Sequence, residues 1–226
     1  MAHSSKPFVI VVGAGPSGLL LALLLVKRGV PVQLLDLSDK EDEQPRATHY
    51  GPPAVYELHR AGVADEIREA GFLPKGVAWR KRDLSIIAEL DATVLEDYPN
   101  RMVCLPLNKV SKILLNRLSA SPLASVFWEH KVLSTGQDEN SAWVEVQTPE
   151  GKKTISAPYI VGCDGANSQI RRSLFGDWEF PGYTWKEQIV ATNVCLVMIA
   201  LVKQTLIVVP RFTTISTSMV LVTQTS

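Results

Sequence analysis

The sequence predicts an α/β fold, and three features of the chain support that prediction. Residues 8–35 read as an apolar strand, a glycine-rich turn, an apolar helix and a second strand, which together make a βαβ unit. Residues 159–172 repeat the order of strand, turn and helix. The segment between them carries further runs with the spacing of strands and helices. Together these features predict a Rossmann-like domain.

The stretch Phe8–Val26 has a second possible interpretation, because its nineteen residues carry no charge. That length would also suit a membrane-spanning helix. In its middle stands GAGPSG, residues 13–18, whose glycines and proline a continuous helix tolerates least. A strand followed by a turn and a buried helix is therefore the better interpretation, and we expect no membrane association.

The GAGPSG turn fits the pattern G-x-G-x-x-G, placed after a strand and at the start of a helix. We expect Gly13 to permit the tight turn, Gly15 to let a pyrophosphate approach the backbone, and Gly18 to let helix and strand pack closely. The N–H groups and the positive dipole end of the helix would then hold the phosphates of a dinucleotide.

Asp36 lies 21 residues after Gly15, at the end of the second strand. There its carboxylate is positioned to accept hydrogen bonds from the hydroxyls of an adenosine ribose. The alternative for Asp36 is a solvated side chain at a strand end. The cofactor-binding candidates of this unit are Gly13, Ala14, Gly15, Ser17, Gly18 and Asp36.

The remaining elements are predicted from periodicity and turn residues. Helical spacing appears over residues 19–28, 53–71 and 108–118, the last with Asn108 as a candidate N-cap. Strands are predicted at residues 8–12, 30–35, 77–80, 85–90, 126–129, 131–134, 142–148, 154–157 and 159–163. We expect 77–80 and 85–90 to form a hairpin, and 154–157 to pair antiparallel with the strand before it.

The composition argues against several classes of protein. The 23 basic and 23 acidic residues balance, so no net charge attracts nucleic acid or an anionic membrane. Cys104, Cys163 and Cys195 are scattered and form no CxxC pair, which argues against a disulfide scaffold or a metal site. Such cysteines suit a reducing compartment, and the N-terminus lacks the pattern of a signal peptide. We therefore expect a cytoplasmic protein.

A second motif, VGCDGANSQIRR at residues 161–172, places Asp-Gly between a strand and a helix. By itself it indicates only a turn that caps a helix. Together with GAGPSG and with PRA at residues 45–47, it resembles the single-component FAD-dependent aromatic hydroxylases, which include p-hydroxybenzoate and salicylate hydroxylases. The matching motifs occur in the family's order and at about its spacing, and the resemblance ends at residue 187.

The resemblance implies roles for several residues. The GAGPSG unit would bind the AMP half of FAD, and Arg46 would approach the FAD phosphates. Asp164 and Gly165 would lie at the position that FAD and the incoming nicotinamide nucleotide both reach. Arg46 also has an ordinary interpretation as a surface arginine, and His49 is either near the flavin or a plain loop histidine. Many relatives place a flavin-contacting glutamine where this chain has Leu107. No catalytic residue can be assigned.

The function implied by the resemblance is NAD(P)H-dependent hydroxylation of a small aromatic compound. NAD(P)H would reduce the bound FAD, and O₂ would supply the oxygen atom added to the ring. Two alternatives stay open: an inactive, truncated FAD-binding fragment, or another FAD- and NAD(P)-dependent oxidoreductase. The sequence does not indicate the oligomeric state.

The end of the chain departs from the family pattern. Relatives carry a third motif that begins with Gly-Asp and holds the flavin ribityl chain, and no such motif follows residue 187. Residues 188–226 contain no Asp, Glu or Gly. We expect residues 1–180 to form the FAD-binding domain, with a β-rich insertion at about 72–100. We expect 181–226 to be the incomplete start of a substrate domain with an atypical tail, in a C-terminally truncated chain. Edge strands laid on the sheet are the alternative for this tail.

Overall fold

The computed structural model describes residues 7–43, 47–81, 83, 85–177, 182–183, 190–195 and 217–222. Arg46 lies outside them, so the role expected for Arg46 stays a prediction. Of the segment after residue 187, only two strands are described, β12 (Val190–Cys195) and β13 (Thr217–Val222), which pair antiparallel.

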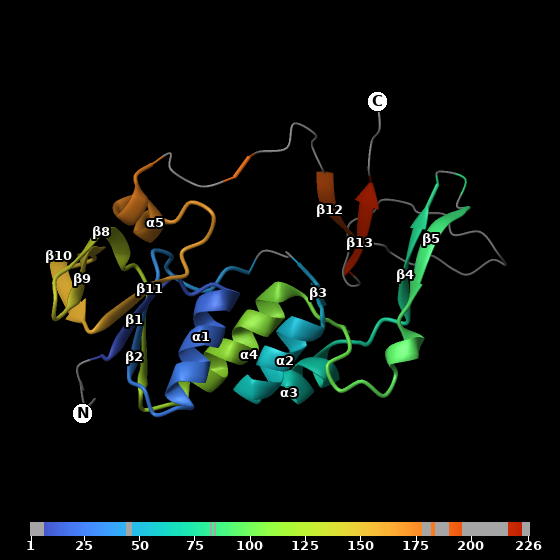
Figure 1. Ribbon diagram of the computed structural model, residues 1–226, viewed down its shortest axis with the longest axis horizontal. Helices are drawn as coiled ribbons and strands as arrows, with labels where there is room; N and C mark the ends of the chain where they lie inside the picture. The colour runs from blue at the N-terminus through green and yellow to red at the C-terminus, as the bar shows by residue number, and fades with distance from the viewer. Residues whose placement is uncertain are drawn as a thin grey trace.

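A four-stranded parallel sheet lies between the helices and a smaller antiparallel sheet (Figure 1). Its strand order is β11-β1-β2-β7, and every neighbouring pair is parallel. The predicted α/β fold is therefore confirmed. The strands are β1 (Val9–Val12), β2 (Val32–Leu35), β7 (Ala124–Phe127) and β11 (Tyr159–Gly162).

Helices cover one face of this sheet (Figure 1). Val9 and Val11 of β1 face them, because successive side chains of a strand point to opposite faces. The helix after the glycine turn is apolar all round because it lies between the sheet and the other helices, and its leucines pack into one core with them. The helices are α1 (Pro16–Val26), α2 (Pro52–Ala61), α3 (Ala64–Ala70) and α4 (Leu107–Ser119).

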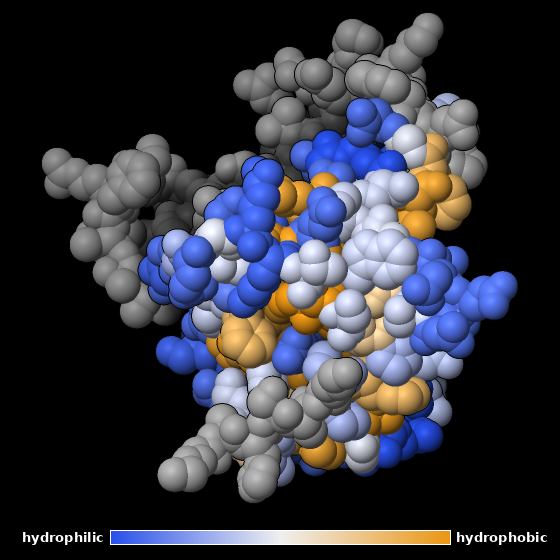
Figure 2. Space-filling view, turned by 90° about the vertical axis from the view of Figure 1, so that its left-hand side faces the viewer, coloured by the Kyte–Doolittle hydropathy of each residue, from blue (hydrophilic) through white to orange (hydrophobic). Residues whose placement is uncertain are grey.

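A second core lies on the opposite face of the parallel sheet. Ile10 and Val12 of β1 pack there against Val144 and Val146 of an antiparallel sheet, together with Ile170. Figure 2 looks onto this side, where hydrophilic side chains are interspersed with hydrophobic ones. The elements are β8 (Lys131–Gln137), β9 (Ala142–Thr148) and β10 (Gly151–Ala157), in the order β10-β9-β8, with α5 (Gln169–Phe175).

The hairpin predicted between the helices is present, at the end of the molecule away from the antiparallel sheet (Figure 1). Backbone hydrogen bonds in both directions between Phe72 and Cys104 connect the two ends of this segment. The elements here are β3 (His49–Tyr50), β4 (Gly76–Arg80), β5 (Ile86–Asp91), the short 3₁₀ helix η1 (Thr93–Leu95) and β6 (Val103–Cys104), with β3 paired to β6 and β4 to β5.

Several element boundaries differ from the sequence predictions. The helical run 53–71 is two helices, because Gly62 adopts a left-handed φ of 77° and ends α2. Asn108 is not an N-cap: α4 begins at Leu107 after Pro106 and has no side-chain cap. The Asn108 amide instead donates to the Glu43 carbonyl at 3.2 Å.

The chain also leaves the parallel sheet earlier than expected after β7. The strand predicted over 126–129 ends at Phe127, because Glu129 takes a positive φ of 56° that turns the backbone. After β1, at the carboxyl end of the parallel strands, α1 begins at Pro16 rather than at residue 19. Proline suits the first turn of a helix, where no N–H partner is required.

Candidate cofactor-binding site

Gly13 occupies a position at the end of β1 that only glycine suits. Its φ is 104°, and its N–H donates to the Leu35 carbonyl at 2.7 Å, which ties the turn to β2. A Cβ added at Gly13 would lie 2.4 Å from the Cys163 carbonyl oxygen. The backbone after β11 therefore passes directly against the turn after β1.

Gly18 lies one turn into α1 and is buried. A Cβ at this position would come within 1.9 Å of the Gly13 carbonyl oxygen, which belongs to the backbone and cannot rotate away. The helix therefore approaches the end of β1 as closely as the sequence pattern predicts for the third glycine.

Gly15 differs from these two glycines, because a Cβ added to it would meet nothing within 4 Å. It is the N-cap residue of α1, no side chain caps the helix, and Ser17 beside it is exposed. The open space at Gly15 therefore adjoins the N-terminus of α1, which no side chain caps. A helix N-terminus of this kind favours an anionic group, because unpaired N–H donors and the positive dipole end coincide there.

Asp36 follows β2 and contacts the glycine turn directly. Its Oδ2 accepts the Ala14 N–H at 2.6 Å, and its Oδ1 accepts the Ser38 N–H at 2.8 Å. The side chain is half-buried, and each carboxylate oxygen retains a lone pair for another donor. The acid and the helix N-terminus, predicted from separate parts of the pattern, therefore lie at one edge of the sheet.

The second motif lies against the first. The Cys163 N–H donates to the Val12 carbonyl at 2.7 Å, so the chain enters Asp164 beside the end of β1. From β1, the sheet continues to β2 on one side and to β11 on the other. This is the point where strand order reverses, and ligands of open α/β sheets bind in the crevice at such carboxyl ends.

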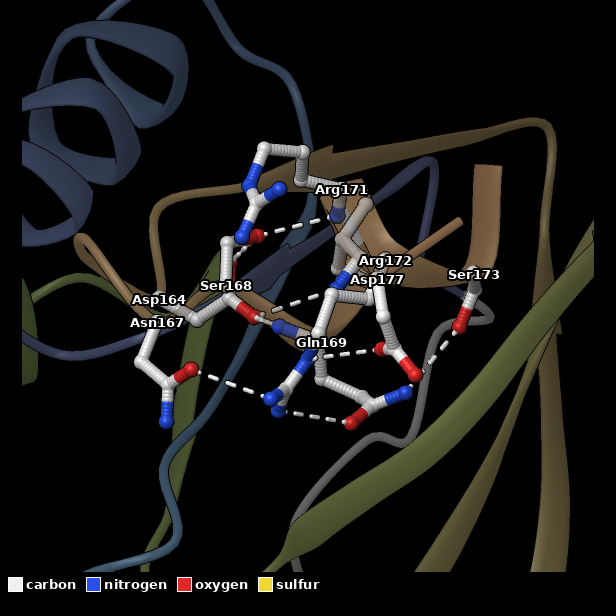
Figure 3. Close-up of polar contacts among 9 residues, drawn as sticks. Asp164, Asn167, Ser168, Gln169, Arg171, Arg172, Ser173 and Asp177 are labelled. Atoms are coloured by element: carbon white, nitrogen blue, oxygen red, sulfur yellow. Dashed lines mark hydrogen bonds and ion pairs between the residues drawn. The ribbon is translucent and has the colours of Figure 1, made fainter. Parts of the chain in front are cut away.

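The carboxylate of Asp164 organises the start of α5 (Figure 3). Its Oδ1 accepts from the Ser168 hydroxyl at 2.6 Å, and its Oδ2 accepts the N–H groups of Gln169 at 2.6 Å and Ile170 at 3.2 Å. The Ser168 hydroxyl in turn accepts the Arg171 N–H at 3.0 Å. The ordinary interpretation of an Asp-Gly turn, a helix cap, therefore applies to this side chain.

Gly165 leaves room at the surface of this turn. It has a φ of 82°, and a Cβ there would meet nothing within 4 Å. The Arg172 side chain stabilises the segment after Gly165 by donating hydrogen bonds to the Asn167 side chain at 3.0 Å and to the Gln169 side chain at 3.1 Å (Figure 3). The role expected for Asp164 and Gly165 toward a cofactor stays a prediction: the backbone at Gly165 is open, and among the described residues Asp164 Oδ1 accepts a single hydrogen bond, from Ser168.

Asp164→Ala is expected to destabilise the chain by about 1–2 kcal/mol, because three donors at the start of α5 lose their acceptor. Urea unfolding followed by circular dichroism measures this change. Asn167→Ala is the matched control, since it removes only one exposed hydrogen bond with Arg172. Equal stability of Asp164→Ala and the parent would contradict the capping role.

The segment 47–50 runs beside the start of α4. The Leu107 N–H donates to the Ala47 carbonyl at 3.1 Å, and the Leu105 N–H donates to the Thr48 carbonyl at 2.9 Å. His49 is exposed, and its Nδ1 lies 2.8 Å from the Thr48 hydroxyl. The structure thus places Ala47 beside Leu107, whereas His49 pairs with Cys104, so a position of His49 near the flavin stays a prediction.

The cysteines with described side chains, Cys104 and Cys163, are unsuited to thiol chemistry. Burial raises the pKa of Cys104 to about 11, and burial together with the Asp164 carboxylate raises the pKa of Cys163. Reactive cysteines instead have lowered pKa values. In the described part of the chain, no group of three metal-ligating side chains comes together, and no helix is long and apolar enough to cross a membrane.

Comparison with known proteins identifies the family. Residues 7–219 match the model of the family described as FAD binding domain, so the likeness continues past residue 187 and its expected end there is wrong. The chain is 35% identical to para-nitrophenol 4-monooxygenase of Pseudomonas sp. (strain WBC-3), over 82% of this chain and 46% of that protein. It is 34% identical to 6-hydroxy-3-succinoylpyridine 3-monooxygenase of Pseudomonas putida (strain DSM 28022 / S16), over 84% and 49%.

Solved structures agree with these matches. p-Nitrophenol 4-monooxygenase of Pseudomonas putida DLL-E4 superposes with a TM-score of 0.78 at 37% identity, covering 84% of this chain and 48% of that one. Aklavinone-11 hydroxylase, in a ternary complex with FAD and aklavinone, gives 0.66 at 25%, covering 76% and 35%. The chain spans about half the length of the two curated relatives, the para-nitrophenol and 6-hydroxy-3-succinoylpyridine monooxygenases. It belongs to the FAD binding domain family, in the group of the FAD-dependent aromatic hydroxylases.

Proposed function

We propose that the chain binds FAD at the carboxyl edge of β1, and that the FAD serves NAD(P)H-dependent hydroxylation of a small aromatic compound with O₂. The observation that carries the proposal is the meeting of three features at this edge: the open backbone at Gly15, the Asp36 carboxylate and the turn at Gly165. All three lie where the strand order of the sheet reverses, which favours one extended ligand over separate small ones.

The residues present fit such a cofactor. The N-terminus of α1 would hold the pyrophosphate, and Gly15 leaves the space that the phosphate oxygens require. The lone pairs left on Asp36 would accept the ribose hydroxyls. Arg46 is proposed to approach the phosphates, and the backbone around Gly165 to contact the flavin half. The bound flavin would supply the exchange of electrons with NAD(P)H and O₂, and the chain would bind, orient and shield it.

The substrate class is proposed from the relatives, which by their names act on nitrophenol and hydroxylated pyridine compounds. For the 226 residues themselves the proposal is FAD binding, since the hydroxylation belongs to relatives about twice as long. A domain boundary near residue 180 and a cytoplasmic location remain part of the proposal. Two described free cysteines agree with a reducing compartment.

Asp36→Ala is expected to weaken FAD binding by roughly 1–3 kcal/mol, because the ribose hydroxyls lose a charged acceptor. The Ala14 N–H also loses its partner, so the measurement is made well below the unfolding midpoint of the variant. Quenching of flavin fluorescence in a titration gives the Kd of each protein.

FMN, which has no adenosine, is the control ligand for Asp36→Ala. The proposal requires that FMN binds the variant and the parent equally well while FAD does not. Equal FAD affinity in the two proteins would show that Asp36 does not contact the bound FAD. Equal losses for FAD and FMN would show that the substitution disturbs the fold rather than a ribose contact.

A further inference from the structure

The bend formed by residues 127–130, directly after β7, lies against the loop that carries Asp36. The Asp36 N–H donates to the Phe127 carbonyl at 2.9 Å, and the His130 N–H donates back to the Asp36 carbonyl at 2.7 Å. The Glu129 N–H donates to the Ser38 carbonyl, also at 2.7 Å. The backbone on both sides of the Asp36 carboxylate is thus fixed by this bend.

The bend contains an unfavourable backbone conformation. Glu129 has a φ of 56°, and in the described part of the chain no other residue except glycine has a positive φ. This conformation is energetically unfavourable for a glutamate, because its Cβ lies too close to the following carbonyl oxygen. The conformation directs two successive N–H groups, those of Glu129 and His130, at the loop after β2. Such a conformation persists only where surrounding contacts hold it.

The side chain of His130 supplies those contacts. It is 8% exposed, its Nδ1 lies 2.7 Å from the Trp128 carbonyl, and its Nε2 lies 3.1 Å from Lys153 Nζ on β10. A carbonyl can only accept and an ammonium can only donate, so Nδ1 carries the proton and Nε2 accepts. The Phe127 ring packs against the imidazole at 5.2 Å between centroids. The imidazole therefore links His130 to Trp128 within the bend and connects the bend to the antiparallel sheet through Lys153.

We propose that His130 is a positioning residue for the cofactor. Through the bend it fixes the backbone of Asp36 and Ser38, and so aims the Asp36 carboxylate at the glycine turn. This inference rests on the proposed role of Asp36 toward the adenosine ribose. Lys153 supports His130 from the neighbouring sheet, and neither side chain contacts the ligand.

A double-mutant cycle tests the proposal, with FAD and ADP as ligands and calorimetry as the measurement. His130→Ala is expected to raise the Kd of both ligands about five- to tenfold, because ADP carries the same ribose as FAD. In the Asp36→Ala background, the same substitution should change neither Kd further. A residue with only a general structural role would weaken binding by the same factor in both backgrounds.

Two more variants keep the test decisive if His130→Ala folds poorly. His130→Asn places an amide N–H where Nδ1 donates to the Trp128 carbonyl, and it should restore most of the affinity. Lys153→Met removes only the exposed partner of Nε2, and it should raise the FAD Kd about two- to threefold without lowering the melting temperature.

The outcomes separate the inference from the function on which it rests. If Asp36→Ala leaves the FAD Kd unchanged, the proposed site itself is wrong. If Asp36→Ala weakens binding but His130→Ala has no effect, or has an equal effect in both backgrounds, only the positioning role is overturned. An unchanged FAD Kd in Lys153→Met, together with no rescue by His130→Asn, would also overturn it.

Discussion

Gly15→Val is expected to remove measurable FAD binding while the chain stays folded. The backbone of Gly15 has a φ of −69°, which any residue adopts, and an added Cβ meets no atom of the protein within 4 Å. The valine therefore costs the fold little. Its methyl groups would occupy the space through which the pyrophosphate approaches the first N–H groups of α1. We expect a loss of at least about a hundredfold in affinity, or ~3 kcal/mol.

Calorimetric titration with FAD measures this loss, and the melting temperature of the same sample reports on the fold. Gly15→Ala is the graded control, since one methyl group obstructs less of the approach than the branched side chain does. If Gly15→Val binds FAD as the parent does, the phosphates do not lie on this turn. If Gly15→Val melts many degrees lower than the parent, the space beside Gly15 is filled by other protein atoms and is not open to a ligand.

Gly18→Ala is expected to have the opposite effect, a loss of fold rather than of ligand alone. Its new Cβ would lie 1.9 Å from the Gly13 carbonyl oxygen and 3.3 Å from Cys163 Cβ. Relief requires α1 to move away from the carboxyl end of β1, which opens the largest core of the molecule. A contact this short with a backbone atom places the cost at the upper end of the usual range for overpacking, about 3 kcal/mol, a large part of a typical stability of about 5–15 kcal/mol.

Gly29→Ala is the matched control, because Gly29 has a φ of 78° but an added Cβ meets nothing within 4 Å. It should cost only the left-handed strain, about 1–2 kcal/mol. Urea unfolding compares the two variants. A Gly18→Ala protein as stable as Gly29→Ala would show that α1 and β1 do not approach each other as closely as described.

The βαβ unit could be predicted because its information is local. Val9–Val12 is apolar on both faces, as a central parallel strand must be. Each of the three glycines is required for a different reason: the positive φ of Gly13, the open space at Gly15 and the close approach of the backbone at Gly18. Asp36 could be predicted for the same reason, since the length of the unit fixes where the second strand ends. The resemblance to the family then added the second motif.

Other features depend on contacts that no local pattern records. The Asp164 carboxylate caps α5, and this role becomes visible only through its hydrogen bonds to the start of the helix. The bend at Glu129 and His130 has no sequence signal, because a positive φ at a glutamate is held by partners in the loop after β2 and on β10. The break between α2 and α3 did have a signal, the glycine at position 62 within a helical run, which outweighed the apolar spacing.

An absorption titration of the unaltered chain with FAD tests whether the flavin dinucleotide binds at the glycine turn. We expect a saturable change in the flavin bands that ends at one FAD per chain, and that excess ADP reverses by competing for the turn and for Asp36. Gly15→Val should give the spectrum of free FAD under the same conditions. A titration of the parent that shows only free FAD, in a sample proven folded by circular dichroism, would contradict the assignment of this edge of the sheet to a flavin dinucleotide.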